Sequence, residues 1–175
     1  LFAADYICKR PGSTLPLRWH QDANYWPLVP MEVATFWFAV SESGPHNGGV
    51  RIIPESHKHG LINHLHEDRE SNLLPSAADP SLYNESEAIN LELQPGDISM
   101  HHPLTLHGSS PNTSDIWRKG GSIQYMPPTT QIVEDGWPSA FLFRGNPVQG
   151  INTYCNRPRY VEGQHMEFAG CEAWK

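Results

Sequence analysis

The tripeptide His20-Gln21-Asp22 carries the clearest capacity for chemistry in this chain. It ends the apolar stretch Leu15–His20, which has the composition of a β-strand. Side chains two positions apart on a strand point to the same face, so an imidazole and a carboxylate can bind one ion from one side. Neutral imidazole is a common metal ligand, and ten histidines in 175 residues are an excess that points to chemistry. We therefore expect His20 and Asp22 to be metal ligands.

A second tripeptide of the same pattern, His66-Glu67-Asp68, lies in the charged run HLHEDRE. Such a run is typical of a solvated surface, so we do not expect a metal site there. The surrounding residues 57–80 are polar and are interpreted as a long insertion or lid, with a short helix around Leu61–Leu74. The alternating histidines of this stretch are interpreted as solvated side chains: His57, His59, His64 and His66.

His107 and Arg118 form the second candidate pair. If a turn is centred between Asn112 and Thr113, the two residues face each other in an antiparallel hairpin, with Cβ atoms about 5 Å apart. An arginine inside a small barrel needs an anion, and its planar guanidinium suits a carboxylate. The alternative is a structural ion pair with an acidic residue such as Asp115.

Two histidines and one carboxylate on a β scaffold leave three of six octahedral positions open. That arrangement is typical of non-haem Fe(II) oxygenases, whereas a structural zinc ion usually has four protein ligands in a tetrahedron. The residues His20, Asp22 and His107 therefore predict a catalytic metal centre. A cupin-like metal-dependent isomerase or hydrolase with the same ligands, and a non-catalytic jelly-roll binding module, remain alternatives.

Short segments rich in β-branched and aromatic residues must position these side chains. The 14 glycines and 16 prolines are spread along the chain, which indicates many turns. We expect an all-β core with a minor helix, arranged as an antiparallel sandwich or jelly roll. The expected strands are Leu15–His20, Glu32–Val40, Gly49–Ile53, Ile89–Leu93, Asp97–His101, Leu104–Ser109, Lys119–Met126 and Ala140–Arg144.

The composition narrows the class of protein. The length suits a single domain over 1–175, and no apolar run approaches the roughly 20 residues of a membrane span. A net charge of -7 without a basic stripe disfavours nucleic-acid binding. The three cysteines, Cys8, Cys155 and Cys171, form no C-x-x-C pair, so a reducing cytoplasm is the expected location. We expect a small-molecule substrate; the composition does not indicate an oligomeric state.

Three stretches carry a resemblance to a known family: WHQDANYWPL, ATFWFAVSESGPHNGGVRIIPESHKHG and LQPGDISMHHPLTLHGSSPNTSDIWRKG. Taken together, they resemble the phytanoyl-CoA dioxygenase family of Fe(II)/2-oxoglutarate-dependent oxygenases over most of residues 18–121. The resemblance implies a double-stranded β-helix, which is a cupin-like jelly roll. It also implies that the protein uses Fe(II), 2-oxoglutarate and O2. It implies that His20, Asp22 and His107 bind the iron. It also implies that Arg118 binds the distal carboxylate of 2-oxoglutarate, assisted by Ser109, and that Trp37 lies beside this cosubstrate.

The chain departs from the family at two points. Glu55 stands where the family usually has glycine in a loop. Family members are also generally much longer, and only 19 residues precede His20, so we expect that an N-terminal portion is missing from this chain.

The expected activity is hydroxylation of a small organic substrate, with decarboxylation of 2-oxoglutarate to succinate and CO2. If Arg118 points inward, strand alternation puts polar side chains on the same inner face. The chain has few clustered lysines or arginines for the phosphates of coenzyme A, which favours a small amphipathic substrate over a long acyl-CoA. The expected pocket residues are Tyr25, Trp26, His102, Ser122 and Gln124.

Overall fold

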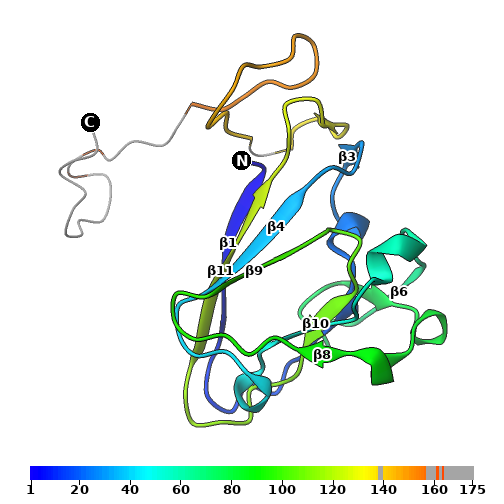
Figure 1. The fold of residues 1–175 in the computed structure, drawn as a ribbon, viewed down its shortest axis with the longest axis vertical. Helices are drawn as coiled ribbons and strands as arrows, with labels where there is room; N and C mark the ends of the chain where they lie inside the picture. The colour runs from blue at the N-terminus through cyan, green and yellow to red at the C-terminus, as the bar shows by residue number, and fades with distance from the viewer. Residues whose placement is uncertain (138–139, 157–160, 162, 164–175) are drawn as a thin grey trace.

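Two four-stranded antiparallel sheets form the body of the protein in a computed structural model that describes residues 1–137, 140–156, 161 and 163. The first sheet contains, in order, β1 (Ala3–Lys9), β11 (Arg118–Tyr125), β4 (Ala34–Ala39) and β9 (Ile98–His101). The second contains β2 (Leu17–His20), β10 (His107–Ser109), β5 (Val50–Ile52) and β8 (Ile89–Asn90). In Figure 1 the long strands of the first sheet run along the left, and β10 and β8 lie to the lower right. This mostly β architecture confirms the expected jelly roll.

Two further sheets have two strands each. β3 (Leu28–Val29) pairs with β12 (Gln131–Ile132), and β6 (His64–His66) pairs with β7 (Ser76–Ala78). The described helices are single 3-10 turns: η1 (Asp22–Asn24), η2 (Pro45–Asn47), η3 (Ser56–His59), η4 (Pro80–Leu82) and η5 (Glu85–Glu87). Of the helices in the described part of the chain, none has the length and apolar character needed to cross a membrane.

Strand alternation in the first sheet separates an inner from an outer face. On β4, Thr35 and Trp37 are buried on the inner face, while Phe36 and Phe38 lie half-buried on the outer face. Gly120 on β11 leaves room for the Trp37 ring, because a Cβ atom at that position would collide with the indole. The inner face is thus built around an aromatic ring that lies close against the neighbouring backbone.

Two apolar clusters form the hydrophobic core of the described residues. Trp19, Ile53, Ala78 and Leu106 pack together at the second sheet. The other cluster contains Phe2, Leu28 and Val33 as its buried members.

The expected hairpin between His107 and Arg118 is wrong. β10 pairs with β2 and β5, so His107 faces His20 and Ile52, whereas Arg118 faces Lys9 across the first sheet. The chain between β10 and β11 therefore crosses from one sheet to the other. The side chain of Asn112 shapes this crossing, because its amide donates to the carbonyls of Lys9 and Ile116.

Three further local expectations differ from the structure. The stretch expected as a helix, Leu61–Leu74, contains β6 and turns, because β6 finds its hydrogen-bond partner in β7. Residues 140–144 form no strand, although the segment was expected to be one. The edge strand β1 was not among the expected strands, and its burial pattern lacks a clean alternation.

Glu55 has the backbone conformation that the family's glycine suggests. Its φ angle of 62° lies in the left-handed region and is the one positive φ of a non-glycine residue in the described chain. The residue precedes η3 and pairs with Lys58 on the surface. A residue without a Cβ atom would adopt this conformation at lower cost.

Candidate metal centre

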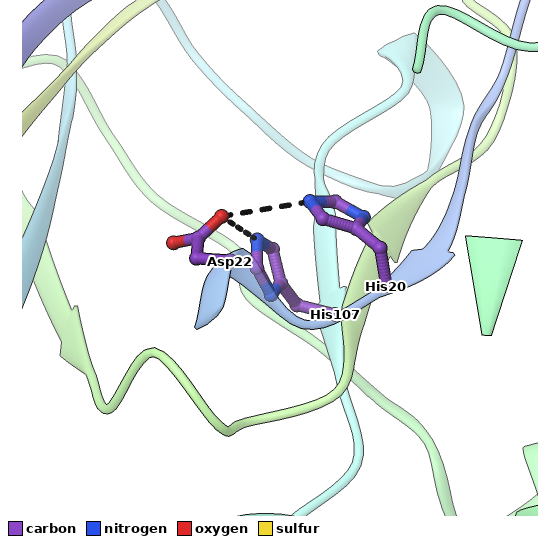
Figure 2. A group of neighbouring side chains, drawn as sticks. All are labelled: His20, Asp22 and His107. Carbon is purple, nitrogen blue, oxygen red and sulfur yellow. Dashed lines mark ion pairs between the residues drawn. The ribbon is translucent and has the colours of Figure 1, made fainter. Parts of the chain in front are cut away.

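The end of β2 and the start of β10 bring two imidazoles together. His20 and His107 are paired across these strands, and their ring centroids lie 4.1 Å apart. Asp22 follows at the start of η1, with Oδ1 3.7 Å from Nε2 of His20 and 3.5 Å from Nε2 of His107 (Figure 2). The three donor atoms lie within 4.8 Å of one another. The structure thus brings the three expected metal ligands to one point.

Backbone carbonyls orient both imidazoles. Nδ1 of His20 donates to the carbonyl of Arg18 at 2.8 Å, and Nδ1 of His107 donates to the carbonyl of Thr105 at 3.0 Å. Because each Nδ1 carries the proton, each Nε2 keeps its lone pair and faces Asp22. A hydrogen bond from the ring nitrogen that does not bind the metal is the usual way in which proteins orient a metal-binding histidine.

Burial sets the charges of these groups. It lowers the pKa of His107 to about 3 and also lowers the pKa of His20, so both rings are neutral near pH 7. Burial opposes ionisation of Asp22, but the adjacent His107, His101 and His20 outweigh it and hold the pKa of this carboxyl below its usual range. Two neutral imidazoles and one carboxylate fit a divalent cation, and this donor set suits Fe(II).

A second cluster of polar atoms lies at the start of β11. Arg118 is 1% exposed; one of its terminal nitrogens donates to the carbonyl of Ile7, and its carbon Cζ lies 4.9 Å from the centroid of the Trp37 ring. Nε of Arg118, Oγ of Ser109 and Nε1 of Trp37 are buried without a hydrogen-bond partner in the described structure. Buried donors need partners, so this cluster is suited to an anion such as a carboxylate.

Arg118 forms no ion pair with an acidic residue in the part of the chain that the structure describes. Asp115, the expected alternative partner, is exposed on the loop before β11. Burial lowers the pKa of Arg118 to about 10, so the side chain stays charged at neutral pH. A buried guanidinium without an acidic partner favours the anion-binding interpretation.

Lys9 is a second buried cation at this position, and the sequence reasoning missed it. It lies opposite Arg118 and is 2% exposed. Its Nζ donates to the carbonyl of Ser109 at 3.1 Å and to the carbonyl of Ser110 at 2.5 Å. Burial and the neighbouring Arg118 lower the pKa of Lys9 to about 7. Lys9 was overlooked because no strand was expected at residues 3–9, and without a strand nothing indicated that its side chain points inward.

One cavity of about 420 Å³ joins the metal triad, which is His20, Asp22 and His107, to the anion cluster, which is Arg118, Ser109 and Trp37. Four of the expected pocket residues line it: Tyr25, Trp26, Ser122 and Gln124. His102 does not line it, because it follows the end of β9, is exposed, and accepts a hydrogen bond from the backbone of Leu104. Its neighbour His101, the last residue of β9, lines the cavity instead.

Gln21 links the metal triad to the segment 57–80. The side chain is fully buried; Nε2 donates to the carbonyls of Gly60 and Leu104 at 2.8 and 2.7 Å, and Oε1 accepts from the backbone of Ile62. The backbone of Gln21 also donates to Nε2 of His64, so this histidine is partnered rather than solvated as expected. The segment reaches the cavity through Leu73 and Leu74.

The second tripeptide of the His-x-Asp pattern, residues 66–68, was expected on a solvated surface. Its His66 and Asp68 are both exposed. They are not part of the group of potential metal ligands found among the described residues. Their exposure agrees with a solvated surface.

The family model described as phytanoyl-CoA dioxygenase matches residues 1–120. A probable alpha-ketoglutarate-dependent hypophosphite dioxygenase of Stutzerimonas stutzeri is 31% identical over 137 residues, which cover 74% of this chain and 44% of that protein. The chain thus spans about half the length of the curated relatives it matches.

This chain is also similar to proteins of known structure. The non-heme monooxygenase ThoJ in its apo form superposes with a TM-score of 0.72 at 29% identity, over 90% of this chain and 56% of that one. The non-heme alpha ketoglutarate dependent carbocyclase SnoK from nogalamycin biosynthesis has a TM-score of 0.59 at 26% identity, over 76% of this chain and 53% of that one. Proteins with this fold and this level of similarity therefore catalyse different reactions.

Proposed function

Because the chain belongs to the phytanoyl-CoA dioxygenase family, we propose that it is a non-haem Fe(II)- and 2-oxoglutarate-dependent oxygenase that hydroxylates a small organic molecule. The observation that carries the proposal is one cavity that joins a site for a divalent cation to a site for a carboxylate. His20, Asp22 and His107 would bind Fe(II), and Arg118 and Ser109 would bind the distal carboxylate of 2-oxoglutarate.

When bound, Fe(II) with 2-oxoglutarate and O2 supplies the oxidising chemistry, in which R–H, 2-oxoglutarate and O2 become R–OH, succinate and CO2. The protein residues orient and shield the reactants. With three protein ligands, an octahedral metal ion would keep three positions for the cosubstrate and O2. Arg118, against which the Trp37 ring packs, would hold the far end of the cosubstrate. The aromatic side chains of Tyr25 and Trp26 cover part of the cavity.

The anion cluster distinguishes this proposal from the two alternatives. A cupin-like isomerase or hydrolase needs the metal ligands but has no need of a buried arginine with unpartnered donors beside them. A binding module without activity has no need of either site. The unpartnered atoms of Arg118, Ser109 and Trp37 therefore support a carboxylate cosubstrate.

The cavity also supports a small substrate. Its volume of about 420 Å³ lies near the lower end of the range for ligand pockets, which is roughly 300–1,000 Å³, and the cosubstrate occupies part of it. Its lining combines the aromatic side chains of Tyr25, Trp26 and Trp37 with the polar Ser122 and Gln124. We propose an amphipathic molecule, such as an amino-acid derivative or a secondary metabolite, rather than a long acyl-CoA.

The test begins with anaerobic addition of Fe(II) and 2-oxoglutarate, which should produce the weak visible charge-transfer band of the chelated cosubstrate. Admission of air with a substrate library should then release succinate, and mass spectrometry of the product should show one added oxygen atom. Asp22→Ala is the control, because it should abolish both signals in a folded protein. Absence of the band and of succinate in the unmodified protein would reject the proposal, and a product without added oxygen would reject hydroxylation.

A further inference from the structure

His101 is a buried histidine of the cavity to which the proposed function assigns no role. It ends β9 on the inner face of the first sheet, opposite Thr35 of β4. Its side chain is 8% exposed, and its ring centroid lies 4.6 Å from that of His107. Both of its ring nitrogens are buried without a hydrogen-bond partner in the described structure. A buried polar group of this kind calls for a partner.

The orientation of His101 differs from that of the two histidines in the metal triad. His20 and His107 each donate Nδ1–H to a backbone carbonyl. No carbonyl of the described chain does this for His101. The acidic group beside it is Asp22, whose Oδ2 lies 3.6 Å from Nε2 of His101. A shift of roughly 0.6 Å brings these atoms to hydrogen-bond distance, and such contacts often tighten when a site is loaded.

The two oxygens of Asp22 have separate surroundings. Oδ1 faces the Nε2 atoms of His20 and His107. Oδ2 accepts a hydrogen bond from Oγ1 of Thr35 at 3.3 Å and lies beside His101. The carboxylate is thus presented to the metal position by one oxygen, while polar groups of the first sheet surround the other.

We infer that His101 is a positioning residue, which donates Nε2–H to Oδ2 of Asp22 and keeps Oδ1 as the single metal-binding atom of this carboxylate. The inference rests on the proposed function, because it concerns the metal site of that function. Binding through both oxygens would occupy a fourth octahedral position. Two positions would then remain for a cosubstrate that takes two and for O2, which takes one. His101 and Thr35 preserve the third open position.

The experiment compares two nearly isosteric replacements, His101→Gln and His101→Met. Glutamine keeps an N–H donor at a similar distance from the backbone, whereas methionine does not. Mn(II) is the probe, and its dissociation constant is obtained from the electron paramagnetic resonance signal of the free ion. Circular dichroism establishes that each variant is folded. A second readout is the position of the charge-transfer band with Fe(II) and 2-oxoglutarate without oxygen.

We expect His101→Met to raise the Mn(II) dissociation constant about tenfold, as changes behind a metal ligand commonly do, and to shift the charge-transfer band. His101→Gln should stay within about threefold of the unmodified protein, because it keeps the donor. Thr35→Val, which removes the other donor to Oδ2, should weaken binding like His101→Met and gives a second test if that variant does not fold. Ser99→Ala is the matched control on β9, since the Ser99 hydroxyl is buried without a partner and does not line the cavity.

Two results would overturn the inference: unchanged Mn(II) binding in His101→Met, or an equal loss in His101→Gln and His101→Met. The second result would mean that the N–H donor is not what the metal site needs. Failure of the unmodified protein to bind Mn(II) at all would instead overturn the proposed function, and the role of His101 with it. The failure of the inference and the failure of the function are thus distinguished by the unmodified protein.

Discussion

Lys9 and Arg118 lie directly opposite each other on β1 and β11, and both are almost completely buried. Neither side chain forms an ion pair with an acidic group of the described chain. The carbonyl oxygens of Ser109 and Ser110 accept from Lys9, while Arg118 keeps an unpartnered Nε. The charge of Arg118 favours an anion at this end of the cavity, and the burial of two adjacent basic groups makes the stability of the protein depend on pH.

The first prediction concerns this pH dependence. The pKa of Lys9 is lowered from 10.5 to about 7 by burial and by Arg118. Between these values the unfolded chain holds a proton that folded Lys9 has released, so the free energy of unfolding should rise as pH increases. Urea unfolding from pH 7 to pH 10 should show a positive slope that Lys9→Met reduces. Equal slopes in both proteins would mean that Lys9 stays protonated in the folded state.

The second prediction concerns the guanidinium of Arg118. Arg118→Lys keeps a positive charge but replaces a planar two-point contact by a single ammonium, so it should weaken binding of 2-oxoglutarate. The expected loss is about 1–3 kcal/mol, measured from anaerobic titration of the charge-transfer band. Arg10→Lys, at an exposed position, serves as the control. Unchanged affinity in Arg118→Lys would return this arginine to a purely structural role.

The third prediction uses two neighbouring glycines of β11. A Cβ atom at Gly120 would collide with the Trp37 ring on the inner face, and one at Gly121 would collide with Phe38 on the outer face. Both Gly120→Ala and Gly121→Ala should lower the free energy of unfolding by about 1–3 kcal/mol. Only Gly120→Ala should also weaken 2-oxoglutarate binding, because it displaces the ring against which Arg118 packs. Equal cosubstrate affinity in the two variants would contradict a role for Trp37.

The fourth prediction concerns the strained backbone at Glu55. Glu55→Gly removes the Cβ atom that disfavours a φ of 62°, so it should raise the free energy of unfolding by up to about 1 kcal/mol. Glu55→Ala is the control, because it keeps the Cβ atom and also loses the surface contact with Lys58. Urea midpoints give the comparison. A glycine variant no more stable than the alanine variant would show that the loop tolerates this conformation without strain.

The sequence by itself determined the features that depend on neighbouring residues. Strand alternation and dense turn residues predicted an antiparallel jelly roll. The two-residue period of a strand predicted the pair His20 and Asp22; β2 ends at His20, but the extended backbone of Gln21 continues the alternation to Asp22 at the start of η1. The motif resemblance pointed to His107, Arg118, Ser109 and Trp37, and the structure places all four around one cavity. The fold and the grouping of these residues could be expected because the period of a strand and a motif can both be read directly from the order of residues, whereas their roles stay predictions.

Tertiary structure alone decided which strands become neighbours. His107 and Arg118 meet across a cavity between two sheets, not across the hairpin that their spacing suggested, since local spacing does not determine which sheet a strand joins. For the same reason, the sequence could not predict that Lys9 lies opposite Arg118, more than a hundred residues away, or that Asp22 lies beside His101. His101 and His102 are adjacent in sequence. His101 is the last residue of β9 and lines the cavity, whereas His102 lies beyond the end of the strand and is exposed to solvent.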